Sequence, residues 1–163
     1  MLIMKLKLFL QKINKKDFDS SSFFDVQIKN RELPILVLLI LSIGLYVFRK
    51  YLFFNNLYLF KDIGSDSLNI VYPYFVHISN YLRIDGIPRW SFNQGIGQNI
   101  FPGSVNEPFA LILYLLGADN IAYGIAYVEL LKIVLGGLVF FFYLRTMLLG
   151  KYASIVGGLI FAF

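Results

Sequence analysis

Cysteine is absent from this chain of 163 residues. Without thiols the protein cannot form disulfides, thiolate metal sites or cysteine nucleophiles. Charged residues are scarce, at 15% of the sequence, and tryptophan and histidine occur once each. Because His77 has no partners at metal-ligand spacing, it is interpreted as a polar residue of a helix face rather than a metal ligand.

Apolar sequence is what the chain has in abundance. Hydrophobic residues make up 58% of it and aromatic residues 18%, whereas soluble domains are roughly 45 to 50% apolar. The composition therefore predicts an all-α fold of polytopic membrane helices. The net charge of +5 does not indicate nucleic acid, because the lysines cluster before an apolar run, where basic residues fix orientation in a bilayer. We expect membrane lipid as a partner and no nucleic acid.

Apolar runs and charges divide the chain into a basic tail and a membrane domain. The tail, residues 1–32, holds seven basic and four acidic residues and is predicted to be cytoplasmic. The membrane domain, 33–163, is predicted to contain a span at 33–54, an extracytoplasmic loop at 55–120, a span at 121–144 and a truncated span at 152–163. A short apolar helix at 108–116, closed by Gly117, should be re-entrant or interfacial, or pack beneath a neighbouring span. Because the third span is too short to cross, the sequence predicts a fragment of a multi-pass protein.

The first half of the extracytoplasmic loop is predicted to be an amphipathic helix opened by a Ser65 or Asp66 cap. Its apolar stripe is Leu68, Val71, Phe75, Ile78 and Leu82. Its polar face is Asp66, Asn69, Pro73, His77, Asn80 and Arg83. A helix with these two faces would lie on the membrane and leave the polar face free for a ligand.

Charged residues of the loop have functional and structural interpretations. Asp66, with Asp62, could accept a proton from an attacking hydroxyl or hold a divalent cation against a phosphate leaving group. Alternatively, Asp66 is a helix cap and Asp62 a solvated loop charge. Arg83 and Arg89 suit a phosphate or pyrophosphate, and equally suit lipid headgroups.

The second half of the loop, Gly86–Asn99, is rich in glycine and amides. It contains a G-x-G, but no strand pattern precedes it and no lysine follows it, so it is not a nucleotide fingerprint. Its glycines allow a tight backbone path, and Trp90 is expected at the membrane interface. Four amides could read sugar hydroxyls, or could simply form turns: Asn93, Gln94, Gln98 and Asn99.

A series of short motifs resembles a known family. In chain order they are Asp66-x-x-Asn69-x-x-Tyr72-Pro73-Tyr74-Phe75, Gly86-x-Pro88-x-Trp90-Ser91, Gly95-x-Gly97-x-Asn99, Glu107-Pro108-Phe109, Leu131-Lys132 and Ser154-x-x-Gly157-Gly158-x-x-Phe161-Ala162. From about Leu33 onward, the chain resembles the amino-terminal part of the YfhO-type family of bacterial multi-span membrane proteins.

The resemblance implies a membrane glycosyltransferase with a GT-C type fold in the bacterial inner membrane. Such enzymes take a sugar from a polyprenyl-phosphate donor on the outer face, here for transfer to a glycan or cell-envelope polymer. Asp66 matches the position of the family's acidic catalytic residue in the first extracytoplasmic loop, where it would act as general base on the acceptor hydroxyl. The chain lacks the adjacent second acid of an Asp-x-Asp pair, so the metal stays unknown and a divalent cation stays an alternative.

The remaining residues of the implied site bind substrate. Arg83 or Arg89 would neutralise the departing lipid phosphate, and His77, Asn93 and Asn99 would also bind substrate. The alternative function is that of a non-catalytic membrane protein, a flippase component or an assembly scaffold, which handles lipid-linked glycans.

Overall fold

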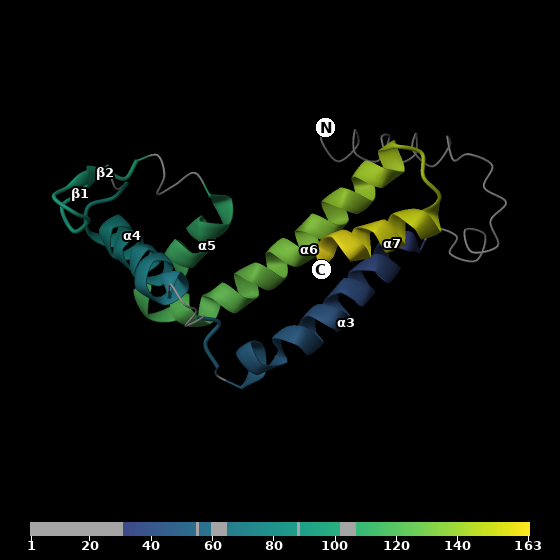
Figure 1. Cartoon of the computed structure of the whole chain (residues 1–163), viewed down its shortest axis with the longest axis horizontal. Helices are drawn as coiled ribbons and strands as arrows, with labels where there is room; N and C mark the ends of the chain where they lie inside the picture. The colour runs from purple at the N-terminus through teal and green to yellow at the C-terminus, as the bar shows by residue number, and fades with distance from the viewer. Residues whose placement is uncertain (1–30, 55, 60–64, 88, 102–106) are drawn as a thin grey trace. The chain divides into compact units, whose positions relative to one another are not determined.

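The computed structural model describes residues 31–54, 56–59, 65–87, 89–101 and 107–163, and these are mostly helical (Figure 1). The elements are α3 (Glu32–Phe53), a π turn η1 (Ser67–Val71), α4 (Tyr72–Ile84), β1 (Trp90–Ser91), β2 (Gln98–Asn99), α5 (Pro108–Leu116), a 3-10 turn η2 (Ala118–Asn120), α6 (Ile121–Thr146) and α7 (Lys151–Ala162). The tail at 1–30 and Asp62 lie outside the described residues. The described residues divide into two compact units, one within Val47–Leu130 and the other made of 31–46 and Leu131–Phe163.

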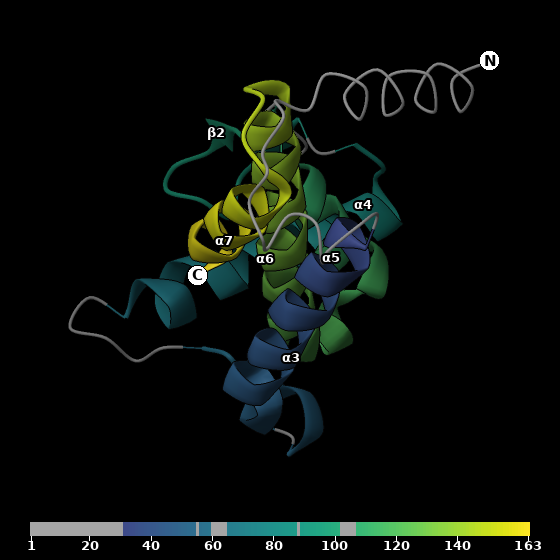
Figure 2. The ribbon, with the colours of Figure 1, turned by 90° about the vertical axis from the view of Figure 1, so that its right-hand side faces the viewer.

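The unit that contains the chain's last residues is built from three helices. Leu36 and Ile40 of α3, Phe141 of α6 and Ile155 of α7 form its buried core, and Figure 2 shows these helices side by side. Glycines of α6 and α7 allow the backbones to approach. A Cβ added to Gly137 would lie 3.0 Å from the carbonyl oxygen of Gly158, and one added to Gly158 would lie 3.0 Å from that of Gly137. Small residues at such a crossing are common between membrane helices.

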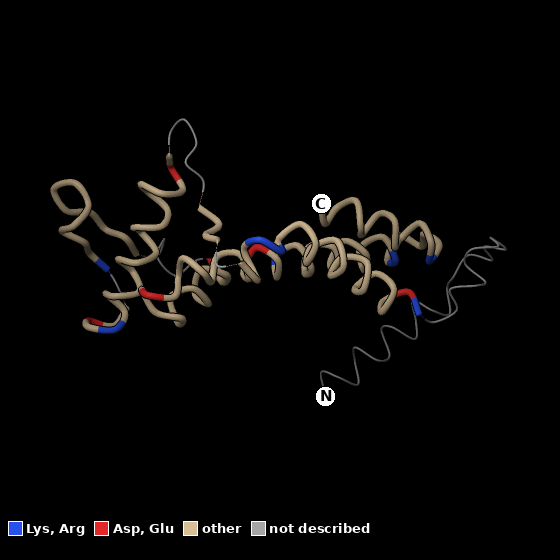
Figure 3. The backbone as a smooth tube through the Cα atoms, turned by 90° about the horizontal axis from the view of Figure 1, so that it is seen from below, with Lys and Arg blue, Asp and Glu red and all other residues tan. Residues whose placement is uncertain are grey.

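Two helical stretches, Glu32–Phe53 and Ala118–Thr146, are long and apolar enough to cross a membrane by length and composition. The first has 22 residues and the second 29, and about 20 residues are enough to span a hydrocarbon core. Only 22% and 28% of their apolar windows are buried, so most of their apolar surface faces outward. Figure 3 shows how few charged residues interrupt the described helices.

The connection from α6 to α7 is short and held by a buried arginine. Arg145, only 4% exposed, donates a hydrogen bond from Nη1 to the carbonyl oxygen of Leu149 at 2.6 Å. Leu148 has φ of 63°, a left-handed conformation that reverses the chain without a glycine. α7 then begins at Lys151, one residue before the start of the predicted span at 152–163.

In the second unit, α5 packs on α4 and on the start of α6. Ile78 of α4 is buried with Ala110 and Tyr114 of α5, and the hydroxyl of Ser79, fully buried, donates to the carbonyl oxygen of Tyr114 at 3.1 Å. Leu113 of α5 is buried with Ile121 and Val128 of α6. α5 has the predicted bounds because Pro108 begins it and Gly117, at φ of 84°, ends it.

The helix of the loop begins differently from the prediction. Asp66 stands at the N-cap position of η1, one of the two predicted alternatives, but its side chain makes no capping hydrogen bond, so the predicted side-chain cap at Asp66 is wrong. Instead the carbonyl oxygen of Ser65 accepts the N–H groups of Leu68, at 3.1 Å, and Asn69, at 2.7 Å. The next turn is a π turn, in which the N–H of Tyr72 donates to the carbonyl oxygen of Ser67.

Pro73 gives a physical reason for the π turn. Proline cannot donate a hydrogen bond to the carbonyl four residues before it, here that of Asn69, and its ring crowds that carbonyl in a regular helix. The wider turn also rotates the start of the helix. Phe75 and Leu82 pack into the cores as predicted, but Leu68 and Val71 are exposed, which corrects the predicted stripe.

A two-stranded antiparallel ribbon follows α4 and was not predicted. Trp90 pairs with Asn99, and Ser91 pairs with Gln98. Gly95, at φ of 59°, and Gly97, at φ of 101°, supply the left-handed conformations that the connecting loop needs. Among the described residues this ribbon is the only β structure. It positions the candidate site.

Candidate functional site

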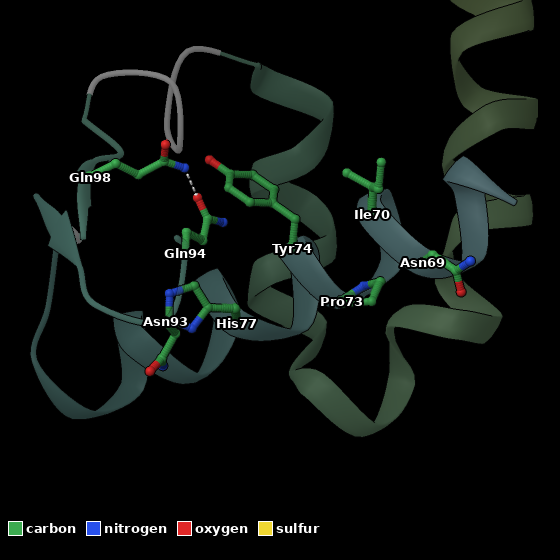
Figure 4. Close-up of a pocket in the computed structure, with 8 residues that line it drawn as sticks. All are labelled: Asn69, Ile70, Pro73, Tyr74, His77, Asn93, Gln94 and Gln98. Carbon is green, nitrogen blue, oxygen red and sulfur yellow. Dashed lines mark hydrogen bonds between the residues drawn. The ribbon is translucent and has the colours of Figure 1, made fainter. Parts of the chain in front are cut away.

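A surface pocket of about 560 Å³ lies between the loop helix and the ribbon. Its lining comes from η1 and α4 on one side and from β2 and the loop before it on the other: Asn69, Ile70, Pro73, Tyr74, His77, Asn93, Gln94 and Gln98. Figure 4 shows Gln94 and Gln98 on the left of the view, Tyr74 near its middle and Asn69 on the right. All of these residues belong to one compact unit.

Three pocket residues recur at four-residue spacing on the helix. Asn69, Pro73 and His77 belong to the predicted polar face, and the structure brings all three to the same pocket. Residues four apart in a helix lie one above the other. Asn80 and Arg83, further along that predicted face, do not line the pocket.

A histidine–serine hydrogen bond connects the ribbon to the helix. His77 Nε2 lies 2.8 Å from Ser91 Oγ, and Ser91 is only 1% exposed. The same hydroxyl oxygen accepts the N–H of Asn93 at 3.2 Å. Because one buried serine contacts both His77 and Asn93, it fixes two walls of the pocket relative to each other.

The lining combines hydrogen-bonding amides with apolar surface. Gln98 Nε2 donates to Gln94 Oε1, which leaves the other polar atoms of both amides for a ligand. Burial raises the pKa of Tyr74, so its hydroxyl is neutral at physiological pH and can both donate and accept. A sugar presents hydroxyls around apolar C–H faces, and this lining offers partners to both.

Behind the pocket, Tyr114 supports Tyr74. Burial, with smaller contributions from Tyr74 and Glu107, raises the pKa of Tyr114 to about 12. The ring of Tyr114 also meets Phe75 edge to face, with centroids 6.0 Å apart. The aromatic wall therefore rests on a neutral, buried cluster rather than on solvent.

Four of the six predicted site residues lie outside the pocket lining, which contains only His77 and Asn93 of that set. Asn99 uses its Oδ1 to accept the N–H of Phe101 at 3.0 Å, as in the turn alternative. The carbonyl oxygen of Arg89 accepts the N–H of Ile100 at 3.0 Å, while the Arg89 residue as a whole is exposed.

Asp66 and Arg83 cannot act on one bond together. They stand at opposite ends of a continuous helical stretch, and a rise of 1.5 Å per residue places them roughly 25 Å apart along it. The guanidinium of Arg83 lies beside Gly117, since a Cβ added there would be 3.4 Å from Nη2. Asp66 is exposed and lies one turn before Asn69. If either residue serves the pocket, it is Asp66.

Metal ligands do not gather in the part of the chain that the structure describes: no group of three His, Asp or Glu residues occurs there. Asp62, the second carboxylate of the cation alternative, lies outside the described residues. Asp66 alone does not make a divalent-cation site, because such ions take several oxygen ligands.

No family model, curated protein or solved structure matches the chain. The resemblance to the YfhO-type family therefore stays a prediction, and the geometry of the pocket carries the functional argument. Sequence reasoning missed Tyr74 and Ile70 as pocket residues. A proline inside a predicted helix was the available signal, because it marks a local widening, and such π turns are frequent at functional sites.

Proposed function

We propose that this chain belongs to a membrane glycosyltransferase of the YfhO type and that its pocket holds the sugar of a polyprenyl-phosphate donor. The observation that carries the proposal is the lining of amides and an imidazole beside the Tyr74 ring. Amides are typical of sites that read several hydroxyls, and a ring with apolar neighbours suits the C–H face of a sugar.

The apolar helices support a membrane location. α3, α6 and α7 expose large apolar side chains on the outside of their three-helix unit: Leu38, Tyr46, Val139, Ile160 and Phe161 are each more than half exposed. In water, an apolar surface of this extent is unfavourable, whereas lipid tails cover it without cost. The pocket residues lie in sequence between α3 and α6, in the segment expected on the outer face.

Asp66 would act as the general base at the Asn69 end of the pocket. Transfer forms a bond between the acceptor oxygen and the sugar's anomeric carbon, breaks the bond from that carbon to the carrier phosphate, and passes the acceptor's proton to the carboxylate. The carrier leaves as a phosphate. The bound sugar would have to place its anomeric carbon near η1, with its hydroxyls toward His77 and the ribbon.

One observation favours the second candidate, a non-catalytic protein that handles lipid-linked glycans. Asp66 does not line the pocket, and a base must come within hydrogen-bond reach of the proton that it removes. The same pocket would then bind the sugar without transferring it. Binding and transfer must therefore be measured separately.

Sugar binding should depend on Asn69 and not on Asn80. Both are exposed asparagines of the same helical stretch, but only Asn69 lines the pocket. Asn69→Ala should weaken binding of a labelled polyprenyl-phosphate sugar by about 3- to 10-fold, since one net hydrogen bond is worth about 0.5–1.5 kcal/mol. The measurement is equilibrium binding to the purified chain in lipid nanodiscs.

Asn80→Ala is the matched control and should bind like the parent. Adding Gln94→Ala to Asn69→Ala should weaken binding further, because the two amides lie on opposite sides of the pocket. If Asn69→Ala and Asn80→Ala bind equally well, the pocket is not the sugar site and the proposed function loses its support.

Membrane topology has a direct test, because the chain has no cysteine of its own. A single cysteine at exposed Asn80 should react with an impermeant thiol reagent in intact cells, while one at Gly150, in the turn between α6 and α7, should react only after lysis. Gel-shift labelling checks both. Reaction of the Gly150 variant in intact cells would place the pocket on the cytoplasmic face. The pocket could then not bind a donor on the outer face of the membrane.

A further inference from the structure

We propose that the tip of the ribbon, formed by Trp90, Phe92 and Ile96, inserts into the headgroup region of the lipid bilayer. This inference rests on the membrane location in the proposed function. It goes further by naming a second lipid contact, separate from the apolar helices, that would hold the pocket at the bilayer surface.

The tip presents large apolar side chains that the rest of the described chain does not cover. Ile96 is fully exposed, Phe92 is 81% exposed and Trp90 is 47% exposed. The two rings are arranged together, with centroids 6.3 Å apart. They also cover Gly97, where an added Cβ would lie 3.0 Å from Trp90 Nε1 and 3.2 Å from Phe92 Cδ1.

Charge points to lipid as the partner. The stretch from Trp90 to Phe101 contains no charged residue, and no acidic residue occurs between Asp85 and Glu107 in the sequence. Arg89 is the only charge in that interval, and it is exposed directly beside Trp90. In a bilayer, anionic phosphates lie directly above the apolar acyl chains. A guanidinium directly beside an apolar tip can therefore contact the phosphates while the tip contacts the acyl chains.

The residue types point the same way. Tryptophan is enriched at the boundary between headgroups and acyl chains, where its ring is covered and its N–H stays near polar groups. The backbone pairing of the ribbon, with Trp90 opposite Asn99 and Ser91 opposite Gln98, reduces the cost of bringing it into a less polar medium. A protein partner would more often be matched by polar and charged groups around the apolar centre.

Insertion would position the candidate site. Asn93 and Gln94 lie in the same loop as the tip, and Gln98 lies in β2, so the ribbon that enters the headgroups also forms one wall of the pocket. A polyprenyl-phosphate sugar carries its phosphate at that depth, because its lipid lies among the acyl chains. The tip would thus fix the pocket at the level where the donor's sugar emerges.

Trp90 is the only tryptophan, so its fluorescence reports on the tip without labelling. The whole chain would be reconstituted into vesicles of phosphatidylcholine and phosphatidylglycerol, made with or without lipids brominated near the headgroup end of the acyl chain. Brominated lipid should quench most of the emission, and acrylamide in the water should quench little of it. Phe92→Ser together with Ile96→Ser should reverse this order, because the tip loses its apolar side chains and Trp90 remains.

Leu115→Ser is the matched control: Leu115 is 88% exposed but lies on α5, so its replacement should leave the quenching of Trp90 unchanged. Strong acrylamide quenching without lipid quenching would overturn the inference, and so would protection from both quenchers, which would mean that protein covers the tip. Alkaline extraction of the same vesicles separates this failure from that of the proposed function. A chain released by alkali is not an integral membrane protein, which contradicts the proposed function, whereas a retained chain with a water-exposed Trp90 refutes only the insertion.

Discussion

Asp66→Asn should reduce sugar transfer by about 10²- to 10⁴-fold, the contribution typical of a positioned base. The substitution keeps the size of the side chain and removes its ability to take a proton. Because Asp66 is exposed and makes no capping hydrogen bond, the change should leave the stability of the chain almost unaltered. The assay would use the full-length protein in membranes, a labelled polyprenyl-phosphate sugar as donor and transfer to cell-envelope material as the readout.

Asp85→Asn is the control for Asp66→Asn, since it removes an exposed carboxylate at the other end of the same helix. It should transfer sugar at the parental rate. Binding of the donor by Asp66→Asn should also be unchanged, because Asp66 does not line the pocket. Parental transfer by Asp66→Asn would reject its role as the base. If, in addition, the parent binds donor but transfers none, the non-catalytic function replaces the enzyme.

Gly137→Ala should destabilise the three-helix unit, although alanine is the better helix former by about 1 kcal/mol. The new Cβ would lie 2.5 Å from Ile40 Cδ1, and 3.0 Å from both Ala162 Cβ and the carbonyl oxygen of Gly158. A side-chain end can move, but the carbonyl belongs to the backbone of α7. Overpacking of this kind costs about 1–3 kcal/mol, so the net effect should be a clear loss of thermal stability in detergent.

Gly136→Ala provides the matched control one position away on α6. A Cβ there would meet only Phe161 Cε1, at 3.8 Å, which is an ordinary contact. The helix propensity of alanine is then unopposed, and the variant should be as stable as the parent or up to about 1 kcal/mol more stable. Equal melting behaviour of the two alanine variants would show that α6 and α7 do not approach at Gly137.

The sequence alone predicted where the main helices lie, but it did not predict the ribbon between α4 and α5. Apolar runs bounded by proline and glycine fix their own ends, so α5 matches its predicted range and α6 begins where predicted, at Ile121. The ribbon could not be read in this way. It has two residues in each strand, too few to show an alternating pattern, and its pairing depends on the backbone of Gly95 and Gly97.

The candidate site was also predictable only in part, namely where its residues share one helix. Helical spacing correctly grouped Asn69, Pro73 and His77, because residues on one helix share a face through local geometry alone. Bringing Asn93 to that face requires the contact between His77 and Ser91, and no local pattern encodes a contact across 14 residues. Arg83 was assigned to the ligand on charge, but charge does not determine direction, and its guanidinium lies against Gly117 instead.

The π turn makes the orientation of Asp66 sensitive to chain length. A π turn is equivalent to an α-helix into which one residue has been inserted, and one residue corresponds to about 100° of rotation around the axis. Deleting a single residue between Ser67 and Val71 would take out the inserted residue and would swing Asp66 by about that angle relative to His77 and the pocket. Homologous chains that differ by one residue at this point would therefore present their first carboxylate to a different side of the site, even with every pocket residue retained.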